Sequence, residues 1–420
     1  MMINFNSDYS LTKINYEDNQ EKLLKIISNL KDNKALGHEF FGWNKMLLEY
    51  DFSLLKQMST DIVAYQKRAD VMVVIGIGGS YLGSLALEKA LTSELSDNKR
   101  KLLYVGNNLS SDYIQEVYDY CVSHDFVMNV VSKSGTTMET ALVFKIFRKL
   151  IIEKYGLAEF SKRVIITSDV ASPLTNYAQE KQMKTYFIPQ DIGGRYSVFT
   201  PAGLLPLVFL NIDVVEIVKG AATAAQKLFQ ATEYNPAFDY ALHRFYQFNH
   251  DKVVEGFISY EPRLQAFIEW IKQLFAESEG KNGQGLLPIG LIFTTDLHSL
   301  GQYIQDGKKI MFETTLKVLK PKANFNLEKE QDDFDSLNRL INLDLNEISE
   351  RIKQSVIIAH SEVGQIPNYQ LEVPQIDEYN MGYLMSFMMY ACTYSAYLLG
   401  VNPFNQPGVE IYKEEIRKKL

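Results

Sequence analysis

The sequence holds little of the material that metal centres and disulfide scaffolds are made from. Two Cys, Cys121 and Cys392, stand far apart in the 420 residues, each in apolar surroundings of helical character. Two isolated cysteines form no disulfide framework, so we interpret them as reduced core residues, which predicts a cytoplasmic location. The six His residues form no HExxH motif and no cluster with Cys. The sequence therefore predicts no metal site and no metal cofactor.

An excess of positive charge is also lacking. Lys and Arg number 43 against 51 Asp and Glu, which gives a formal net charge of −8. Proteins that bind nucleic acids present basic faces to the phosphate backbone, so we expect no nucleic acid as the main partner. We interpret the basic residues of Lys317–Lys322 and of Arg417–Lys419 as solvated charge.

The sequence has no pattern of a membrane span or a secretory signal. Asn380–Val409 lacks Asp, Glu, Lys and Arg, but it contains Asn, Ser, Thr and two Pro. A span needs about 20 mainly apolar residues, so we expect a helix buried in a soluble domain and no membrane contact. Met1–Tyr16 carries Asp8 and other polar residues without an apolar core, which predicts no signal peptide.

The order of apolar strands and amphipathic helices predicts an α/β protein. Strands alternate with helices from about residue 61 to 189, as in a doubly wound parallel sheet. The second half repeats this alternation less regularly, which predicts a second, similar sheet. We expect four parts, with helical arms at both ends: an N-terminal arm (1–60), a first domain (61–195), a second domain (196–400) and a C-terminal helix (401–420).

Apolar runs bounded by turn signals predict the individual strands. A long amphipathic pattern predicts one unbroken helix over Leu204–Gln230, and a shorter pattern predicts a helix near Glu21–Asn33. The expected strands are Val71–Ile77, Leu102–Gly106, Phe126–Ser132, Arg163–Ser168, Thr185–Ile188, Val253–Ser259, Leu286–Thr294, Lys309–Val318 and Tyr369–Val373. The other main expected helices are Gly83–Leu91, Ser111–Cys121, Met138–Tyr155, Pro173–Lys181, Tyr240–His250, Pro262–Glu277, Leu345–Ser361, Tyr379–Gly400 and Val409–Lys419.

The segment Ser132–Thr137 is the most informative stretch of the sequence. It lies between the apolar run Phe126–Val131 and the helical pattern of Glu139–Ile152, and it holds five hydroxyl or amine side chains and one Gly. The first N–H groups of a helix lack partners and lie at the positive end of its dipole, so this arrangement predicts an anion site. Neutral hydroxyls with one Lys suit a monophosphate better than a polyphosphate with Mg²⁺. The alternative is an ordinary Ser/Thr helix cap.

A second loop of this kind, Gly76–Gly83, precedes it. The loop follows an apolar strand and leads into a helix, but Tyr81 stands where the dinucleotide fingerprint has its third Gly. It is not a P-loop either, because Ser84 and Leu85 follow Gly83 where that motif has Lys. The carboxyl ends of strands in an open α/β sheet converge on one ligand crevice. We therefore expect the two loops to share one ligand.

Other candidate residues lie at predicted turns and helix ends. Gly193-Gly194-Arg195 lies in a joining region, where the Gly pair permits a positive φ and close backbone approach and would hold Arg195 beside a ligand. Glu277 ends a helix together with Glu279, and only one of the two carboxylates need be catalytic. Taken singly, a structural turn and a solvated carboxylate are the alternatives.

Three more candidates lie in the last third of the chain. His298 follows an apolar strand and a turn, and Gln406 directly precedes the terminal helix. Lys413 lies about two turns into that helix. A lone His at a strand end is more often structural, and a lone Lys on a terminal helix is usually solvated.

Taken together, these loops resemble the glucose-6-phosphate isomerase (phosphoglucose isomerase) family in its shorter bacterial form. The motifs occur in the family's order and span almost the whole chain. The resemblance implies two sugar-isomerase (SIS) domains and an obligate homodimer that binds a sugar phosphate. The matching motifs are Gly76–Gly83, Ser132–Thr137, Gly193–Ser197, Glu277–Lys281, His298 and Gly408–Lys413.

The resemblance also implies a role for each matching position. Arg195 matches the cation beside the enediolate, and Glu277 matches the base that moves the proton between C2 and C1. His298 and Lys413 match residues associated with opening the sugar ring, and His298 would reach into the partner's site. Gly79 and Gln406 match further substrate contacts. The residues that match the family's phosphate-holding positions are Ser80, Ser132, Lys133, Ser134 and Thr137.

Two other functions remain open at the level of the sequence. A related isomerase acting on another sugar phosphate, such as mannose 6-phosphate, would use the same proton chemistry. A SIS-type sensor would keep the hydroxyl-rich loops, but it would have no need of Glu277, His298 and Lys413 together. The reaction that the resemblance implies is the interconversion of glucose 6-phosphate and fructose 6-phosphate through ring opening and a cis-enediolate. This reaction moves a proton and no hydride, so we expect no nicotinamide or other cofactor.

Overall fold

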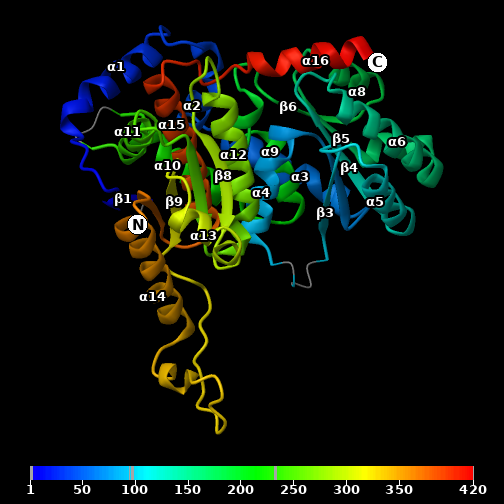
Figure 1. The fold of residues 1–420 in the computed structure, drawn as a ribbon. Coiled ribbons are helices and arrows are strands. Elements are labelled where there is room, and N and C mark those ends of the chain that lie inside the picture. Colours follow the sequence, from blue (N-terminus) through cyan, green and yellow to red (C-terminus); the bar gives the residue numbers. More distant parts are fainter. Residues whose placement is uncertain (1–2, 94, 96–98, 231–233, 420) are drawn as a thin grey trace.

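The computed structural model describes residues 3–93, 95, 99–230 and 234–419. Two separate five-stranded sheets organise it (Figure 1). The first sheet has the order β3-β2-β4-β5-β6, and all its strands are parallel. These strands are β2 (Val71–Ile75), β3 (Lys101–Val105), β4 (Phe126–Ser132), β5 (Val164–Ser168) and β6 (Lys184–Phe187).

Both faces of the first sheet are covered, as a doubly wound sheet requires. Along β2, Met72 and Val74 belong to the main core, whereas Val73 and Ile75 belong to a second core on the other face. All the residues of β2 and β4 are buried. The helices between the strands are α4 (Leu82–Leu91), α5 (Ser111–Ser123), α6 (Met138–Tyr155), α7 (Leu157–Arg163) and α8 (Pro173–Glu180).

The second sheet has the order β1-β10-β9-β7-β8. Its four strands from the second half of the chain are parallel, and β1 (Asn4–Tyr9) adds to one edge as an antiparallel strand. The N-terminal segment, which we predicted to be a helical arm, thus begins with a strand of this sheet. The four parallel strands are β7 (Val254–Ser259), β8 (Leu287–Ile292), β9 (Met311–Val318) and β10 (Asn368–Val373).

One prediction about the helices is wrong. The expected helix Leu204–Gln230 is two helices, α9 (Pro201–Phe209) and α10 (Val214–Leu228). Asn211 between them has a φ of +63°, and the Asp213 side chain accepts hydrogen bonds from the N–H groups of Val215 and Glu216 to cap α10. Apolar periodicity continues across the break, because both helices face the same core.

Among the remaining helices, α11 and α12 pack against α15, as α10 also does. The long helix α15 is buried over most of its length and lies so close to α10 that a Cβ on Gly382 would lie 1.9 Å from the carbonyl oxygen of Ile217. No helix within the described residues is long and apolar enough to cross a membrane. These helices are α1 (Gln20–Lys31), α2 (Gly42–Leu48), α3 (Phe52–Gln66), α11 (Pro236–Phe248), α12 (Gln265–Glu279), α13 (Gly301–Asp306), α14 (Leu345–Ile358), α15 (Glu378–Leu398) and α16 (Pro407–Lys419).

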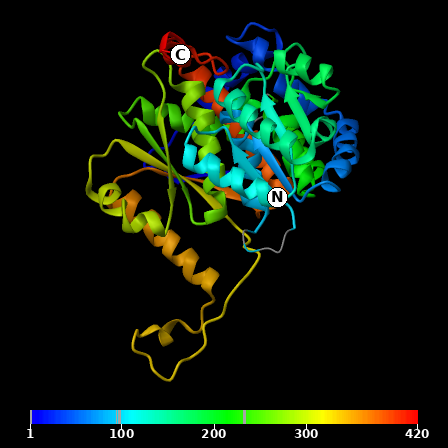
Figure 2. The ribbon, with the colours of Figure 1, turned by 90° about the vertical axis from the view of Figure 1, so that its right-hand side faces the viewer.

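Two features of this arrangement bear on function. Helix α12 from the second half packs against α4 from the first half, next to the carboxyl end of β2. Residues 319–358, which we call the projecting arm, run out from β9 and return through α14, and both views show them standing away from the body of the molecule (Figures 1 and 2).

Candidate active site

The two polar loops lie side by side, as predicted. Strands β2 and β4 are paired neighbours, with Ile75 opposite Val130, so the segments that follow them leave the same edge of the sheet. In the loop after β4, the hydroxyls gather around Thr137: the Ser132 Oγ donates to it at 3.3 Å, and the Ser134 Oγ lies 3.4 Å from it. Thr137 directly precedes α6, so this cluster lies at a helix N-terminus, where an anion is stabilised.

Gly79 brings the other loop into contact with the joining region. A Cβ built on Gly79 would lie 2.1 Å from the carbonyl oxygen of Gly194 and 2.7 Å from the nitrogen of Arg195. The predicted reason for the Gly pair is therefore wrong: the close approach requires a glycine at position 79, whereas a Cβ on Gly194 would have no atom within 4 Å. The residue with a positive φ is Gly78, at +57°. Gly193 has a φ of −67°. Ser80 follows in the same short turn and is partly exposed.

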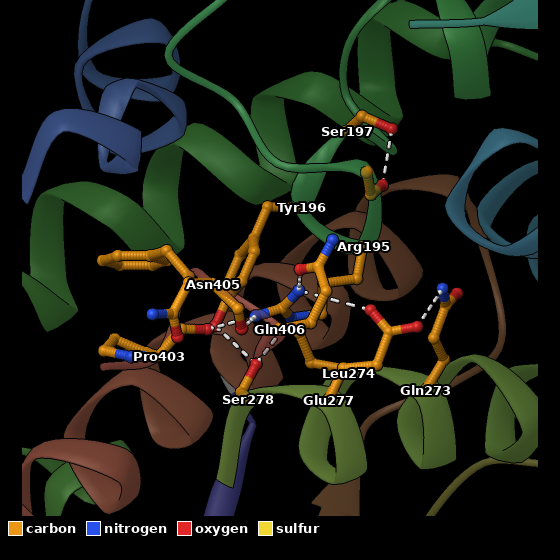
Figure 3. A network of polar contacts seen from close by, with 12 residues as sticks. Arg195, Tyr196, Ser197, Gln273, Leu274, Glu277, Ser278, Pro403, Asn405 and Gln406 are labelled. Carbon is orange, nitrogen blue, oxygen red and sulfur yellow. Dashed lines mark hydrogen bonds and ion pairs between the residues drawn. The ribbon is translucent and has the colours of Figure 1, made fainter. Parts of the chain in front are cut away.

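Arg195 lies at the centre of a network of polar contacts (Figure 3). Only 2% of the residue is exposed. Its Nη1 donates to Glu277 Oε2 at 3.2 Å and to Gln406 Oε1 at 2.8 Å, and its Nε donates to Ser278 Oγ at 2.8 Å. Residues from three distant parts of the sequence therefore converge on one guanidinium.

The carboxylate of Glu277 is held from both sides. Its Oε1 accepts from Gln273 Nε2 at 3.0 Å, one turn back on α12, and its Oε2 accepts from Arg195. The side chain remains 32% exposed, whereas that of Arg195 is 1% exposed. The geometry fixes a carboxylate beside a buried cation and leaves it accessible to a small molecule.

The structure distinguishes the two carboxylates at the end of α12. Glu279 is fully buried and bonds Arg244, which is also paired with the buried Glu255 at 2.7 Å. Burial raises the pKa of Glu279, against the opposing effect of Arg244. Glu279 thus belongs to a buried charge network with Arg244. Glu277 is the carboxylate that contacts Arg195.

The amine of Lys133 contacts the joining region. Its Nζ donates to the backbone carbonyl oxygens of Gln190 and Ile192, at 2.7 and 2.9 Å, and so ties the hydroxyl loop to the segment that leads into Arg195. Burial lowers the pKa of this amine, and the nearby carboxylates of Asp169 and Asp191 oppose the shift. Direct contact between the Lys133 amine and a phosphate stays a prediction.

His298 and Lys413 lie away from this network. His298 is exposed at the end of a short turn after β8, an edge strand of the second sheet. Lys413 lies on α16 and pairs with Glu410 at 2.8 Å. Among the described residues, no hydrogen bond or ion pair connects either side chain to Arg195 or Glu277. A single chain therefore assembles part of the predicted site.

The sequence interpretation missed several residues of the network. Gln273 could have been found, because it lies four residues before Glu277 and so on the same helical face. Ser278 and Lys281 were visible as neighbours of Glu277, but nothing in the sequence showed which atoms they would contact. The carbonyl groups of Pro403 and Asn405, which accept from Arg195 Nη2 at 2.6 and 3.1 Å, leave no sequence signal.

No group of three or more His, Cys, Asp or Glu side chains in the described part of the chain is arranged to hold a metal ion. Both Cys121 and Cys392 are buried with free thiols. Burial raises the pKa of each thiol to about 12, which makes both of them poor nucleophiles.

Comparisons with known proteins agree on one family. A family model described as phosphoglucose isomerase matches residues 61–420. A glucose-6-phosphate isomerase of Bacillus cereus (strain AH187) is 43% identical over 396 residues, which cover 92% of this chain and 88% of that protein.

Solved structures share the fold. A hypothetical protein from Thermus thermophilus has a TM-score of 0.89 at 24% identity, and the match covers 100% of this chain and 99% of that chain. A glucose-6-phosphate isomerase from Chlamydia trachomatis has a TM-score of 0.73 at 21% identity, covering 86% of this chain and 72% of that chain.

Proposed function

The chain belongs to the phosphoglucose isomerase family, and from this premise we propose which of its residues carry out the reaction. The reaction is the aldose–ketose interconversion of glucose 6-phosphate and fructose 6-phosphate through a cis-enediolate, a step of glycolysis and gluconeogenesis. The fold is that of two SIS-type domains, each built on a parallel sheet. We propose domain limits of 61–195 and 196–400, with residues 1–60 and 401–420 as flanking segments.

Glu277 is the base of the proposed mechanism. A proton on C2, next to a carbonyl carbon, is weakly acidic, and a carboxylate within reach can move it to C1. The bonds from Gln273 and Arg195 fix the orientation of Glu277, and its exposed fraction leaves room for the sugar. Proton transfer within one molecule needs neither a hydride acceptor nor a metal.

Arg195 stabilises the charge that develops during the transfer. Proton removal places negative charge on the enediolate oxygen, and a fixed buried cation stabilises such charge without reorganising at the moment of reaction. The five hydrogen bonds that Arg195 donates hold its guanidinium in place. The contact between the buried Arg195 and the accessible Glu277 is the observation that carries this proposal.

The two loops hold the phosphate, remote from the reacting carbons. The clustered hydroxyls of Ser132, Ser134 and Thr137 lie at the N-terminus of α6, and Ser80 lies on the neighbouring loop. Binding energy from this non-reacting group orients the sugar at Glu277. Gln406 and the backbone at Gly79 would contact the sugar, and Lys133 would hold the hydroxyl loop in position from behind.

We propose that the active form is a homodimer in which His298 completes the partner's site. We assign the opening of the sugar ring to His298 and Lys413. His298 is exposed beside an edge strand, and the projecting arm carries large exposed apolar side chains, which indicate a surface for another protein. The most exposed of these are Phe325 (68%), Phe334 (83%), Leu345 (47%) and Ile352 (45%). We also propose a cytoplasmic location, as expected of an enzyme of glycolysis.

A coupled assay of fructose 6-phosphate conversion to glucose 6-phosphate tests the proposed function, with EDTA present and mannose 6-phosphate run in parallel. We expect turnover of fructose 6-phosphate that EDTA does not reduce. Faster turnover of mannose 6-phosphate would reassign the specificity. Stabilisation by the sugar phosphate without turnover would move the protein to the sensor class and would refute the role of Glu277.

A further inference from the structure

The segment 402–406 joins the buried helix α15 to α16, and two cations from elsewhere in the chain hold its backbone. Arg195 donates to the carbonyl oxygens of Pro403 and Asn405 and to the side chain of Gln406. Lys281 Nζ donates to the carbonyl oxygen of Asn402. The buried ring of Phe404 packs against Tyr196, with ring centroids 5.2 Å apart. The segment is therefore anchored by one apolar side chain and by two charged donors.

Lys281 and Arg195 also meet at Ser278. Lys281 Nζ donates to the carbonyl oxygen of Ser278 at 2.8 Å, and Arg195 Nε donates to the hydroxyl of the same residue at 2.8 Å. Because this carbonyl belongs to the last turn of α12, a cation there also opposes the negative end of the helix dipole. Both cations thus connect the end of α12, which carries Glu277, to residues 402–406.

The charge of Lys281 is sensitive to its surroundings. Burial, and then repulsion by Arg195, lower the pKa of this amine to about 8, whereas the facing groups of Cys392, Glu277 and Glu279 oppose the shift. These groups come from η4 (Gly194–Tyr196), α12 and α15, the elements packed around the amine. Deprotonation leaves the amine a weaker donor to two carbonyl groups, so the attachment of the segment weakens as the pH rises.

We propose that Lys281 is a positioning residue for the isomerase reaction, which docks residues 402–406 onto the end of α12. By this contact it keeps Gln406 beside Arg195 and sets the start of α16, on which Lys413 lies. The inference rests on the proposed roles of Arg195, Glu277 and Lys413. It adds a residue that touches neither the reacting carbons nor the phosphate in that proposal.

Two substitutions at Lys281 test the inference. In Lys281→Met, which removes the donor and keeps most of the apolar stem, we expect faster hydrogen exchange in peptides spanning 402–419. We also expect kcat to fall by about 10- to 100-fold, because small misplacements in a site have effects of that size, with a smaller change in KM. Lys272→Met is the matched control, since Lys272 lies on the same helix and pairs with Glu269 at the surface.

The dependence of kcat/KM on pH distinguishes a positioning role of Lys281 from a purely structural role. In the wild type we expect kcat/KM to decline above about pH 8, following Lys281 in the free enzyme. In Lys281→Arg the decline should move to higher pH, because a guanidinium stays protonated. An unchanged decline in Lys281→Arg would overturn the inference. So would a Lys281→Met variant with wild-type exchange at 402–419 and kcat within twofold of the wild type.

Hydrogen exchange also tests the docking role of Lys281 independently of isomerase activity. A wild-type protein without isomerase activity would refute the proposed function, but faster exchange at 402–419 in Lys281→Met would still show that Lys281 docks the segment. Thermal unfolding of both variants shows that they are folded before either readout is taken.

Discussion

At the scale of single residues, the proposed chemistry depends on which of two neighbouring carboxylates is accessible to the substrate. Glu277 lies beside Arg195 and is partly exposed, whereas Glu279 is buried against Arg244. The sequence places both residues at a helix end but says nothing of what they face. Helical phase alone could not separate them, because the contacts come from η4 and α11, which are distant in sequence.

Replacing Glu277 by Gln tests the base directly. We expect Glu277→Gln to bind fructose 6-phosphate with an affinity close to that of the wild type. The amide has the size of the carboxylate that it replaces and can still form hydrogen bonds with Gln273 and Arg195. Turnover should fall by about 10²- to 10⁴-fold, the usual contribution of a general base. Calorimetric binding and the coupled assay measure the two effects. Glu269→Gln, exposed on the same helix, is the control, and a near-normal kcat in Glu277→Gln would remove the base assignment.

Arg244 is predicted to matter for stability rather than for catalysis. Its guanidinium is fully buried between Glu255 and Glu279, so Arg244→Met leaves two buried carboxylates without their cation. Removing one partner of a buried ion pair typically costs about 3–5 kcal/mol of unfolding free energy. Urea denaturation should show a loss of this size, whereas Arg263→Met at a partly exposed pair should cost about 1 kcal/mol or less. Equal losses in the two variants would contradict this account.

His243 should make the protein sensitive to acid. Burial lowers the pKa of its imidazole to about 4, and it also raises the pKa of Asp239, 3.7 Å away, to about 6. The imidazolium that forms in acid therefore finds no ionised partner. A depressed folded-state pKa contributes stability that is fully present above the unfolded value near 6.5 and is lost as the pH falls through about 4.

His243→Leu removes this titration and serves as its measurement. Between pH 8 and pH 4, the unfolding free energy of the wild type should fall by about 3 kcal/mol more than that of the variant. Urea titrations at a fixed protein concentration give both curves, and the difference isolates His243 from Asp239 and the other carboxylates. Parallel curves would show that the imidazole titrates alike in the folded and unfolded chains.

At the scale of elements, the site depends on how closely two loops can approach. Gly79 permits backbone contact with Gly194 and Arg195, where a methyl group would lie 2.1 Å from an oxygen and ordinary contact begins near 3.4 Å. In Gly79→Ala the loop or Arg195 must move by about 1 Å, which we expect to lower kcat by about 10²-fold. The coupled assay measures this. Gly301→Ala should leave activity unchanged, since its nearest atoms lie 4.0 Å away; equal activity in the two variants would contradict the argument.

Helices and strands could be predicted from the sequence where a single apolar pattern covers the whole element. Strand β4 (Phe126–Ser132) and helix α6 (Met138–Tyr155) have the predicted bounds, because a mostly apolar run and a long amphipathic run each end at turn residues. The helix break at Leu210–Asp213 was missed, since the apolar face continues across it. The strand β1 was missed because its NFNSDY sequence gains strand character only by pairing with β10.

At the scale of the whole molecule, the sequence singles out candidate residues without showing which of them meet. Glu277 and Gln406 lie 82 and 211 positions beyond Arg195 along the chain, and yet both accept hydrogen bonds from it. Motif order along the chain singled out these residues. The packing of α12 against η4 brings Glu277 to Arg195, and the hydrogen bonds from Arg195 to Pro403 and Asn405 bring Gln406 there. His298 and Lys413 carry the same kind of sequence signal, but neither contacts Arg195 or Glu277 among the described residues. In the proposed dimer, His298 would meet the Glu277 of the partner chain.

The assembly can be tested by mixing two inactive variants. If His298 serves the partner's site, a heterodimer of Glu277→Gln with His298→Ala contains one site with both an intact Glu277 and an intact His298. Random reassembly makes half of the dimers mixed, so about a quarter of the wild-type activity should return, given a closed two-fold dimer. The coupled assay after joint unfolding and refolding measures this return, and each variant refolded alone is the control. If His298 instead acts within its own chain, every subunit of the mixture lacks one of the two groups, and no activity returns although the dimers form.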